Sequence, residues 1–271
     1  MPLTLELTTQ PEVPLEVEGL TPRIAAEQTS EQLASFPIYH GNRKQTLGEF
    51  FSLSGSAADL KLRFLGELSG VHWLGAGLDE GEVIIEGNAG RHVGSEMTGG
   101  RIEVQGDTSD WLGGEMHGGE IFVRGNAGHL VGAAYRGSRR GMTGGHIIVR
   151  GNAGNEIGHT MRRGTIAIGG RSGDLPGFNM IAGSIYLFGE CGIRPGAAMK
   201  RGTIAYCGEH HPELLPTFRA AGTDQPDVFR LVWNQLRNRG LEIDASLDES
   251  RFALHHGDFL ELGRGEIWVR Q

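Results

Sequence analysis

A frame of nineteen residues repeats along the middle of the chain and constrains its fold more than any other feature. The glycine that begins each frame stands at positions 81, 100, 119, 145, 164, 183 and 202. The spacing is nineteen each time except between Gly119 and Gly145, where it is 26, so one repeat carries an insertion of seven residues, which lies within the segment 132–142. Fixed-period self-similarity of this size is typical of a solenoid.

Apolar residues recur at alternate positions after each frame glycine, which is counted here as position zero. Position +2 is Val or Ile in every frame, and position +4 is Val, Ile, Leu or Tyr. This spacing predicts a strand with those side chains pointing into a core. A methionine stands three residues before each new frame glycine, and a ladder of methionines can fill a narrow core. The sequence therefore predicts an all-β fold, a parallel β-helix with rungs of nineteen residues.

Position +3 should point away from this core, and yet it is mostly apolar. It holds Ile84, Glu103, Phe122, Ile148, Ala167, Tyr186 and Ala205. A strand that is apolar on both faces is normally covered on both. We therefore expect a flanking segment of this chain, or another subunit, to pack on this outer wall.

The periodicity divides the chain into three predicted parts. Residues 1–58 form an N-terminal flanking segment with two short strands and a short helix that begins at Thr29 or Ser30. Residues 59–208 form the β-helix. Residues 209–271 form a C-terminal cap or docking segment, with a helix over 227–239 ended by Gly240 and a terminal strand pair after it.

Composition narrows the function classes. The net charge of −8 argues against general binding of nucleic acid. No apolar run approaches the length of a membrane span, and the N-terminus lacks the pattern of a signal peptide. The two cysteines, Cys191 and Cys207, form no CxxC pair, which favours a reducing compartment. We expect a cytoplasmic protein that binds neither nucleic acid nor membrane.

Arginines concentrate in the middle repeats. Between positions 124 and 171 there are eight arginines and one acid, Glu156. Such a patch can bind an anion, dock a subunit or remain a solvated face. The insertion loops out from a corner, and Arg162-Arg163 and Lys200-Arg201 can continue its charge as one stripe. The candidate binding residues are Arg124, Arg136, Arg139, Arg140, Arg150, Arg162 and Arg163.

Signatures of catalysis are missing from the sequence. It contains no GxSxG, HExxH, P-loop or dinucleotide-binding motif. The eleven histidines include pairs at 210–211 and 255–256, but no spacing suggests a metal site. We predict no catalytic residue and no metal ligand in this chain, and a scaffold role.

Several segments resemble a known family. The GNAG turns, the opening PLTLELT…VPLEVEGLTP and the GNRKQTLGEFF segment are similar to the C subunit of formylmethanofuran dehydrogenase. Within this family, the chain looks most like the C subunit of the bacterial formyltransferase/hydrolase complex. The solenoid portion also resembles the C-terminal domain of the glutamate synthase large subunit.

The resemblance implies a non-catalytic structural subunit in tetrahydromethanopterin-linked one-carbon metabolism (formaldehyde oxidation, methylotrophy). Its partners would be an amidohydrolase-like subunit, a formyltransferase subunit and a dehydrogenase-like subunit. The family's methanofuran-type coenzyme carries a polyglutamate tail, which is a fitting ligand for the arginine patch. Two alternatives remain: the C subunit of a tungsten or molybdenum formylmethanofuran dehydrogenase, and a stand-alone β-helix enzyme.

Overall fold

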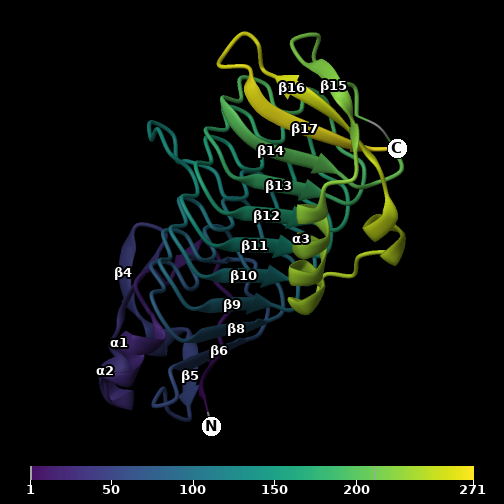
Figure 1. The fold of residues 1–271 in the computed structure, drawn as a ribbon. Coiled ribbons are helices and arrows are strands. Elements are labelled where there is room, and N and C mark those ends of the chain that lie inside the picture. Colours follow the sequence, from purple (N-terminus) through teal and green to yellow (C-terminus); the bar gives the residue numbers. More distant parts are fainter. Residues whose placement is uncertain (1, 211) are drawn as a thin grey trace.

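The computed structural model describes residues 2–210 and 212–271, so Met1 and His211 of the predicted histidine pair lie outside it. The architecture is mostly β. Thirteen strands form one large mixed sheet, and four short strands form a second sheet. Figure 1 shows the large sheet as a ladder in which the chain loops back between successive strands. We call each such turn of the chain a coil.

The N-terminal segment closes one end of the ladder. β1 (Leu3–Leu7) pairs in parallel with β6 (Lys61–Leu65) and antiparallel with β5 (Phe51–Ser54). The second sheet contains β2 (Leu15–Glu16), β3 (Pro37–His40), β4 (Arg43–Thr46) and β7 (Val71–His72). The short helices are α1 (Pro22–Ala26), α2 (Ser30–Ala34) and the 3-10 turn η1 (Leu47–Glu49). Thr29 caps α2 as predicted, in a capping box with Gln32.

The repeats form seven consecutive parallel strands in register. They are β8 (Glu82–Glu86), β9 (Arg101–Val104), β10 (Glu120–Val123), β11 (His146–Val149), β12 (Thr165–Ile168), β13 (Ser184–Leu187) and β14 (Arg201–Tyr206). Equivalent positions lie opposite each other, as Ile121 does to Ile102 and Ile147. The side chains at +2 and +4 and the six repeat methionines are buried in one core, which confirms their predicted direction.

Asn and Asp side chains tie each coil to the next at the turn after the strand. The Oδ1 atom of Asn88 accepts a hydrogen bond from the backbone N–H of Asp107 at 2.9 Å. In the same way, Oδ1 of Asp107 accepts from the backbone N–H of Asn126 at 2.6 Å, and Oδ1 of Asn126 accepts from that of Asn152 at 2.8 Å. The GNAG turns therefore have an additional role, because their side chains satisfy backbone donors of the neighbouring coil.

The glycine at +6 is needed for close approach in most coils. Every frame has a glycine at this position, and of these seven glycines only Gly87 has a positive φ, of 133°. At Gly106, an added Cβ would lie 2.6 Å from the backbone carbon of Gly87 and 2.5 Å from Oδ1 of Asn88. The neighbouring coil thus excludes any side chain at this corner.

The C-terminal segment extends the ladder past the last repeat. β17 (Arg264–Arg270) pairs in parallel with β14, and β16 (Phe252–Gly257) pairs antiparallel with β17, which confirms the predicted strand pair. β15 (Arg219–Asp224), which the sequence did not predict, pairs antiparallel with β16. The predicted helix is α3 (Asp227–Asn238), followed by the 3-10 turn η2 (Ala245–Glu249). In the described part of the chain, no helix has the length and apolar character needed to cross a membrane.

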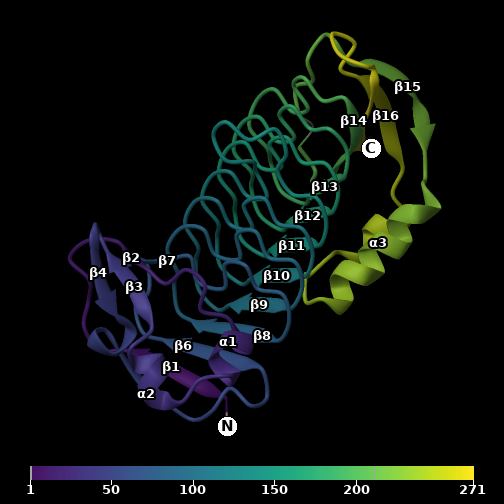
Figure 2. The ribbon, with the colours of Figure 1, turned by 90° about the vertical axis from the view of Figure 1, so that its left-hand side faces the viewer.

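Helix α3 covers the outer wall. Phe229, Trp233 and Leu236 on one side of α3 form a second buried cluster with wall residues that include Phe122, Ile148, Ala167, Tyr186 and Ala205. The Trp233 ring meets the Tyr186 ring edge-on, with centroids 5.4 Å apart. Figure 2 shows α3 lying alongside the strands, outside the coils. The C-terminal segment of this chain is therefore the element that packs on the wall, at least from β10 to β14.

Replacing Trp233 tests this packing. Trp233 is fully buried, so Trp233→Ala should lower the free energy of unfolding by about 3–5 kcal/mol through lost burial and a residual cavity. Gln235→Ala on the exposed side of α3 is the control and should change it by less than about 0.5 kcal/mol. Urea unfolding followed by circular dichroism measures both, and equal stabilities of the two variants would contradict the assignment.

Candidate functional site

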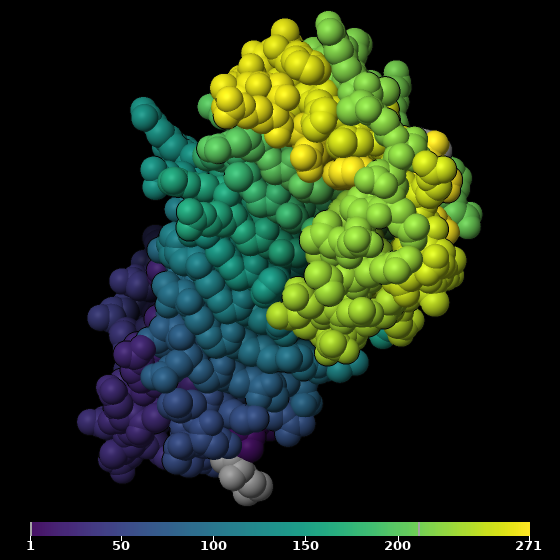
Figure 3. Space-filling model, in the orientation of Figure 1, coloured from purple at the N-terminus to yellow at the C-terminus, as the bar shows by residue number. Residues whose placement is uncertain are grey.

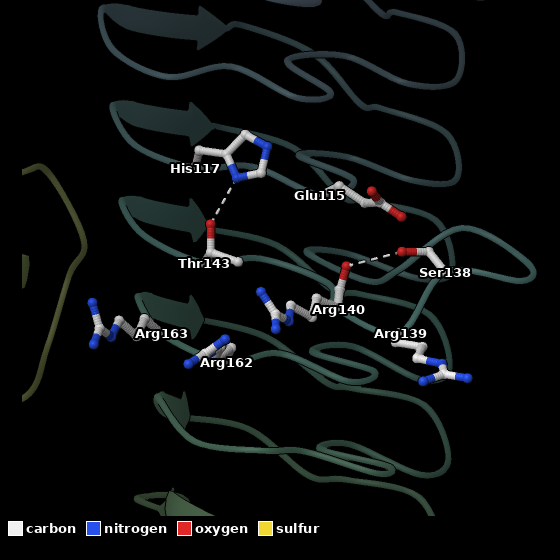
Figure 4. Close-up of a pocket in the computed structure, with 8 residues that line it drawn as sticks. All are labelled: Glu115, His117, Ser138, Arg139, Arg140, Thr143, Arg162 and Arg163. Atoms are coloured by element: carbon white, nitrogen blue, oxygen red, sulfur yellow. Dashed lines mark hydrogen bonds between the residues drawn. The ribbon is translucent and has the colours of Figure 1, made fainter.

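A basic cavity of about 700 Å³ lies where the insertion leaves the coils. Its lining includes four of the seven predicted arginines, namely Arg139, Arg140, Arg162 and Arg163. The first two come from the insertion, and the other two come from the following coil (Figure 4). His117, Thr143, Ser138 and Glu115 complete the lining. The structure thus brings together arginines that are more than twenty positions apart.

Among the described residues, the arginines of the basic cavity have no acidic partner. Within residues 2–210 and 212–271, no carboxylate lies at ion-pair distance from Arg139, Arg140, Arg162 or Arg163. The one acid in the lining, Glu115, accepts a hydrogen bond from the backbone N–H of Tyr135 at 2.9 Å. The cavity therefore offers several guanidinium groups to an anion, each able to donate charge-assisted hydrogen bonds.

A second cavity continues the basic surface along the coils. It measures about 460 Å³ and is also lined by Arg162 and Arg163, with Arg201 on its far side. Arg201 lies opposite Arg264 in the pairing of β14 with β17. The predicted basic stripe thus runs from the insertion to Arg201 along two adjoining cavities, which share Arg162 and Arg163.

Arg124 and Arg150 lie away from these cavities. Each follows the end of a strand, whereas Arg163 precedes the start of one, so the two groups occupy opposite ends of the strands. Arg124 pairs with Glu103 at 2.8 Å. Arg150 pairs with Glu242, just after α3, and so helps to fix the C-terminal segment. These two side chains are already engaged within the chain.

Arg136 lines a third, smaller cavity on the insertion, of about 240 Å³, together with Trp111, Tyr135, Glu156 and His159. The tip of the insertion, residues 136–140, is exposed and projects from the side of the coils, as the teal loop in Figures 1 and 3 shows. Arg136 is therefore the first residue of this exposed tip, and it lies outside the lining of the basic cavity.

An aromatic stack anchors the base of the insertion. The rings of Trp73 and His92 lie 4.0 Å apart and nearly parallel, and Trp111 continues the stack 5.4 Å beyond His92. Tyr135, the residue before the exposed tip, packs against this stack with its ring 5.6 Å from that of His92. Burial raises the pKa of Tyr135 to about 12 and lowers the pKa of His92 to about 4. The insertion is therefore held by neutral aromatic packing at its base.

Four groups of the basic cavity were not among the predicted binding residues: Glu115, His117, Ser138 and Thr143. His117 and Thr143 precede the frame glycine by two residues, as Arg162 does, and their side chains are joined by a hydrogen bond of 2.7 Å. Comparing this position across the repeats would have found them. In the part of the chain that the structure describes, no three His, Cys, Asp or Glu residues gather as a metal site would require.

Comparisons with known proteins relate the chain to two kinds of complex. No protein-family model matches it. The C subunit of the tungsten-containing formylmethanofuran dehydrogenase 2 of Methanothermobacter thermautotrophicus is 41% identical over 90 residues, which is 32% of this chain and 33% of that protein. The C subunit of the molybdenum-containing formylmethanofuran dehydrogenase 1 of the same organism is 44% identical over 84 residues, which is 31% and 21%. The matches span about a third or less of these curated relatives.

A solved structure matches over nearly the whole length. It is a chain of the formyltransferase/hydrolase complex (FhcABCD) from Methylorubrum extorquens, in complex with methylofuran. The TM-score is 0.89 with 29% identity, and the match covers 99% of both chains. The predicted resemblance to the C subunit of formylmethanofuran dehydrogenase and to the formyltransferase/hydrolase complex is confirmed by these matches.

The low pKa of His92 predicts how stability depends on pH. In the unfolded chain a histidine binds a proton near its usual pKa of 6.5, whereas folded His92 binds one near 4. The unfolded state therefore holds more protons between these values, and the free energy of unfolding should fall as the pH falls from 6.5 to 4. His92→Asn should make this decline shallower, since asparagine does not titrate and tolerates the left-handed φ of 63°. Urea titrations across this pH range measure the slope, and identical slopes would contradict the prediction.

Proposed function

We propose that the chain is a non-catalytic structural subunit of a formyltransferase/hydrolase complex. The observation that carries this proposal is the match over 99% of both chains to a chain of such a complex. We further assign the stacked coils to a parallel β-helix, which the in-register parallel strands support, with nineteen-residue intervals in every repeat but the one that carries the insertion. Residues 59–208 would form this β-helix, 1–58 its N-terminal flank and 209–271 its cap and docking segment.

In this proposal the β-helix organises the catalytic subunits. The partners are an amidohydrolase-like subunit, a formyltransferase subunit and a dehydrogenase-like subunit, which act in tetrahydromethanopterin-linked one-carbon metabolism. The complex would move a formyl group between a furan-containing coenzyme and tetrahydromethanopterin and release formate. A cytoplasmic location fits the two free cysteines, one of them buried.

The basic cavity is proposed to hold the polyglutamate tail of a methanofuran-type coenzyme. Four guanidinium groups without an ion-pair partner among the described residues surround about 700 Å³ and fit a chain of carboxylates, and Arg201 extends the path along the adjoining cavity. The matched complex contains methylofuran. Arg136 would reach the tail from the insertion, and Arg124 and Arg150 would be peripheral because they pair with Glu103 and Glu242.

Two other candidate functions have some support. The identities of 41% and 44% favour the C subunit of a tungsten- or molybdenum-containing formylmethanofuran dehydrogenase. Alternatively, the arginines of the basic cavity dock an acidic neighbouring subunit. A stand-alone β-helix enzyme is the remaining class, and it predicts that the isolated chain turns over a substrate.

The polyglutamate assignment predicts salt-dependent binding. Each exposed arginine–carboxylate contact is worth up to about 1 kcal/mol, so replacing Arg139, Arg140, Arg162 and Arg163 with Ala should weaken binding of a labelled oligoglutamate roughly 10- to 50-fold at low salt. High salt should remove most of the difference through screening. Fluorescence anisotropy titrations at both salt concentrations measure it.

The control replaces the paired arginines, Arg124 and Arg150, with Ala. This variant removes the same type of charge at the other end of the strands, and we expect oligoglutamate affinity close to that of the unaltered chain. The control removes two charges and the quadruple variant removes four, so a control that loses half as much binding free energy as the quadruple variant would mean that net charge alone attracts the peptide. Unchanged affinity in the quadruple variant, with lost assembly of the complex, would favour the docking function.

The composition of the native complex tests the assignment to a complex. Purification through an affinity tag on this chain should recover a formyltransferase and an amidohydrolase-like subunit, and the material should release formate from a formylated furan coenzyme. Metal analysis of the same material separates the candidates: tungsten or molybdenum in amounts stoichiometric with this chain would favour the dehydrogenase. Recovery of the chain alone would contradict both.

A further inference from the structure

The large sheet ends in an exposed strand at its C-terminal side. β15 is the last strand in the order, and all six of its residues are exposed. No strand within residues 2–210 and 212–271 pairs with its outer side. Figure 2 shows β15 standing clear of the coils at the margin of the molecule. Such an edge can pair with a strand of another chain, and proteins often block it with long charged side chains or proline.

The sequence of β15 is self-complementary when two copies run antiparallel. The strand reads Arg-Ala-Ala-Gly-Thr-Asp, so a two-fold axis at its centre places Arg219 opposite Asp224 of the second copy at both ends. Opposite charges directly across a pair of strands stabilise it. The middle of the strand consists of the small residues Ala220 to Gly222, where its register with β16 shifts. Their side chains are too short to prevent a second strand from approaching.

The charges at both ends of β15 are available. Arg219 has no carboxylate at ion-pair distance among the described residues, and its guanidinium lies over the Phe259 ring, 5.2 Å from the ring centre. The Asp224 carboxylate accepts a hydrogen bond from the backbone N–H of Gln225 at 2.8 Å. Each end therefore carries one charge that a second copy can pair.

Exposed apolar side chains flank both ends of the strand. Near Arg219 lies the turn between β16 and β17, where Phe259, Leu260 and Leu262 are 50%, 81% and 56% exposed. The backbone N–H of Phe259 donates to the carbonyl of Thr217 at 3.1 Å, which fixes this turn beside the start of β15. After Asp224, the first turns of α3 carry Val228 and Leu231, which are 57% and 65% exposed. Antiparallel pairing would bring the turn of one copy toward the start of α3 in the other.

We propose that two copies of this chain associate through β15, antiparallel about a two-fold axis, with Arg219 of each paired to Asp224 of the other. Five of the eight exposed large apolar side chains of the described residues then lie at this one interface. An isologous contact of this kind is the commonest symmetry of soluble dimers. The interface is separate from the basic cavity and does not rest on the function proposed above.

A charge-swap experiment tests the pairing. The full-length chain should have twice the mass of its 29.2 kDa monomer by light scattering at micromolar concentration. Arg219→Asp and Asp224→Arg each place like charges opposite one another at both ends, so each variant alone should be monomeric. When the two variants are mixed, one copy offers only acids and the other only arginines. The mixture should therefore recover the dimer mass.

Controls keep the outcome decisive. Arg43→Asp, an exposed charge reversal at the other end of the molecule, should leave the dimer intact. Unchanged circular dichroism and thermal unfolding would confirm that the monomeric variants are folded. A monomeric unaltered chain, dimeric single variants, or a mixture that stays monomeric would each overturn the proposal. The proposal would also be overturned if the backbone amides of β15 became protected from hydrogen exchange only after another subunit is added.

Discussion

Hydrogen bonding between neighbouring coils is the interaction on which the rest of this structure depends. A single coil cannot satisfy its own backbone donors and acceptors, so each one needs the coil before it and the coil after it. The strands supply most of these bonds, and the Asn88, Asp107, Asn126 and Asn152 side chains supply one more at each of four successive turns. This requirement fixes the register, and the register in turn places equivalent side chains in columns along the molecule.

A stack of this kind leaves two open ends and an apolar wall, and the flanking segments cover them. β1 and β5 extend the sheet at the N-terminal end, and β17, β16 and β15 extend it at the other. Helix α3 buries the wall with Trp233 and Phe229, and the ion pair between Arg239 and Glu120, at 2.7 Å, helps to hold it there. The flanks are therefore part of the same folded unit, since the wall would expose Ile148 and Tyr186 without them.

Features that depend on local periodicity could be predicted from the sequence, and features that depend on distant partners could not. The directions of Ile147 and Met142 follow from positions within one frame, and both are buried as expected. That the wall needs a cover also follows from the frame, but the identity of the cover depends on α3, which lies beyond the last frame. β15 gives no signal, because small and polar residues become a strand there only through pairing with β16. Trp73, His92 and Trp111 meet only once their coils are stacked.

The arginines show how the same frame can assign one residue type to different tasks. An arginine at the end of a strand, such as Arg150, lies near the C-terminal segment and pairs with Glu242 there. An arginine before the start of a strand, such as Arg163, faces the basic cavity and keeps its charge unpaired among the described residues. Charge counted along the sequence therefore overstates the charge that a ligand can use. The insertion adds positive charge at the basic cavity, where a ligand can reach it. Tyr135 anchors the loop at its base and leaves Arg139 and Arg140 beside Arg162 and Arg163.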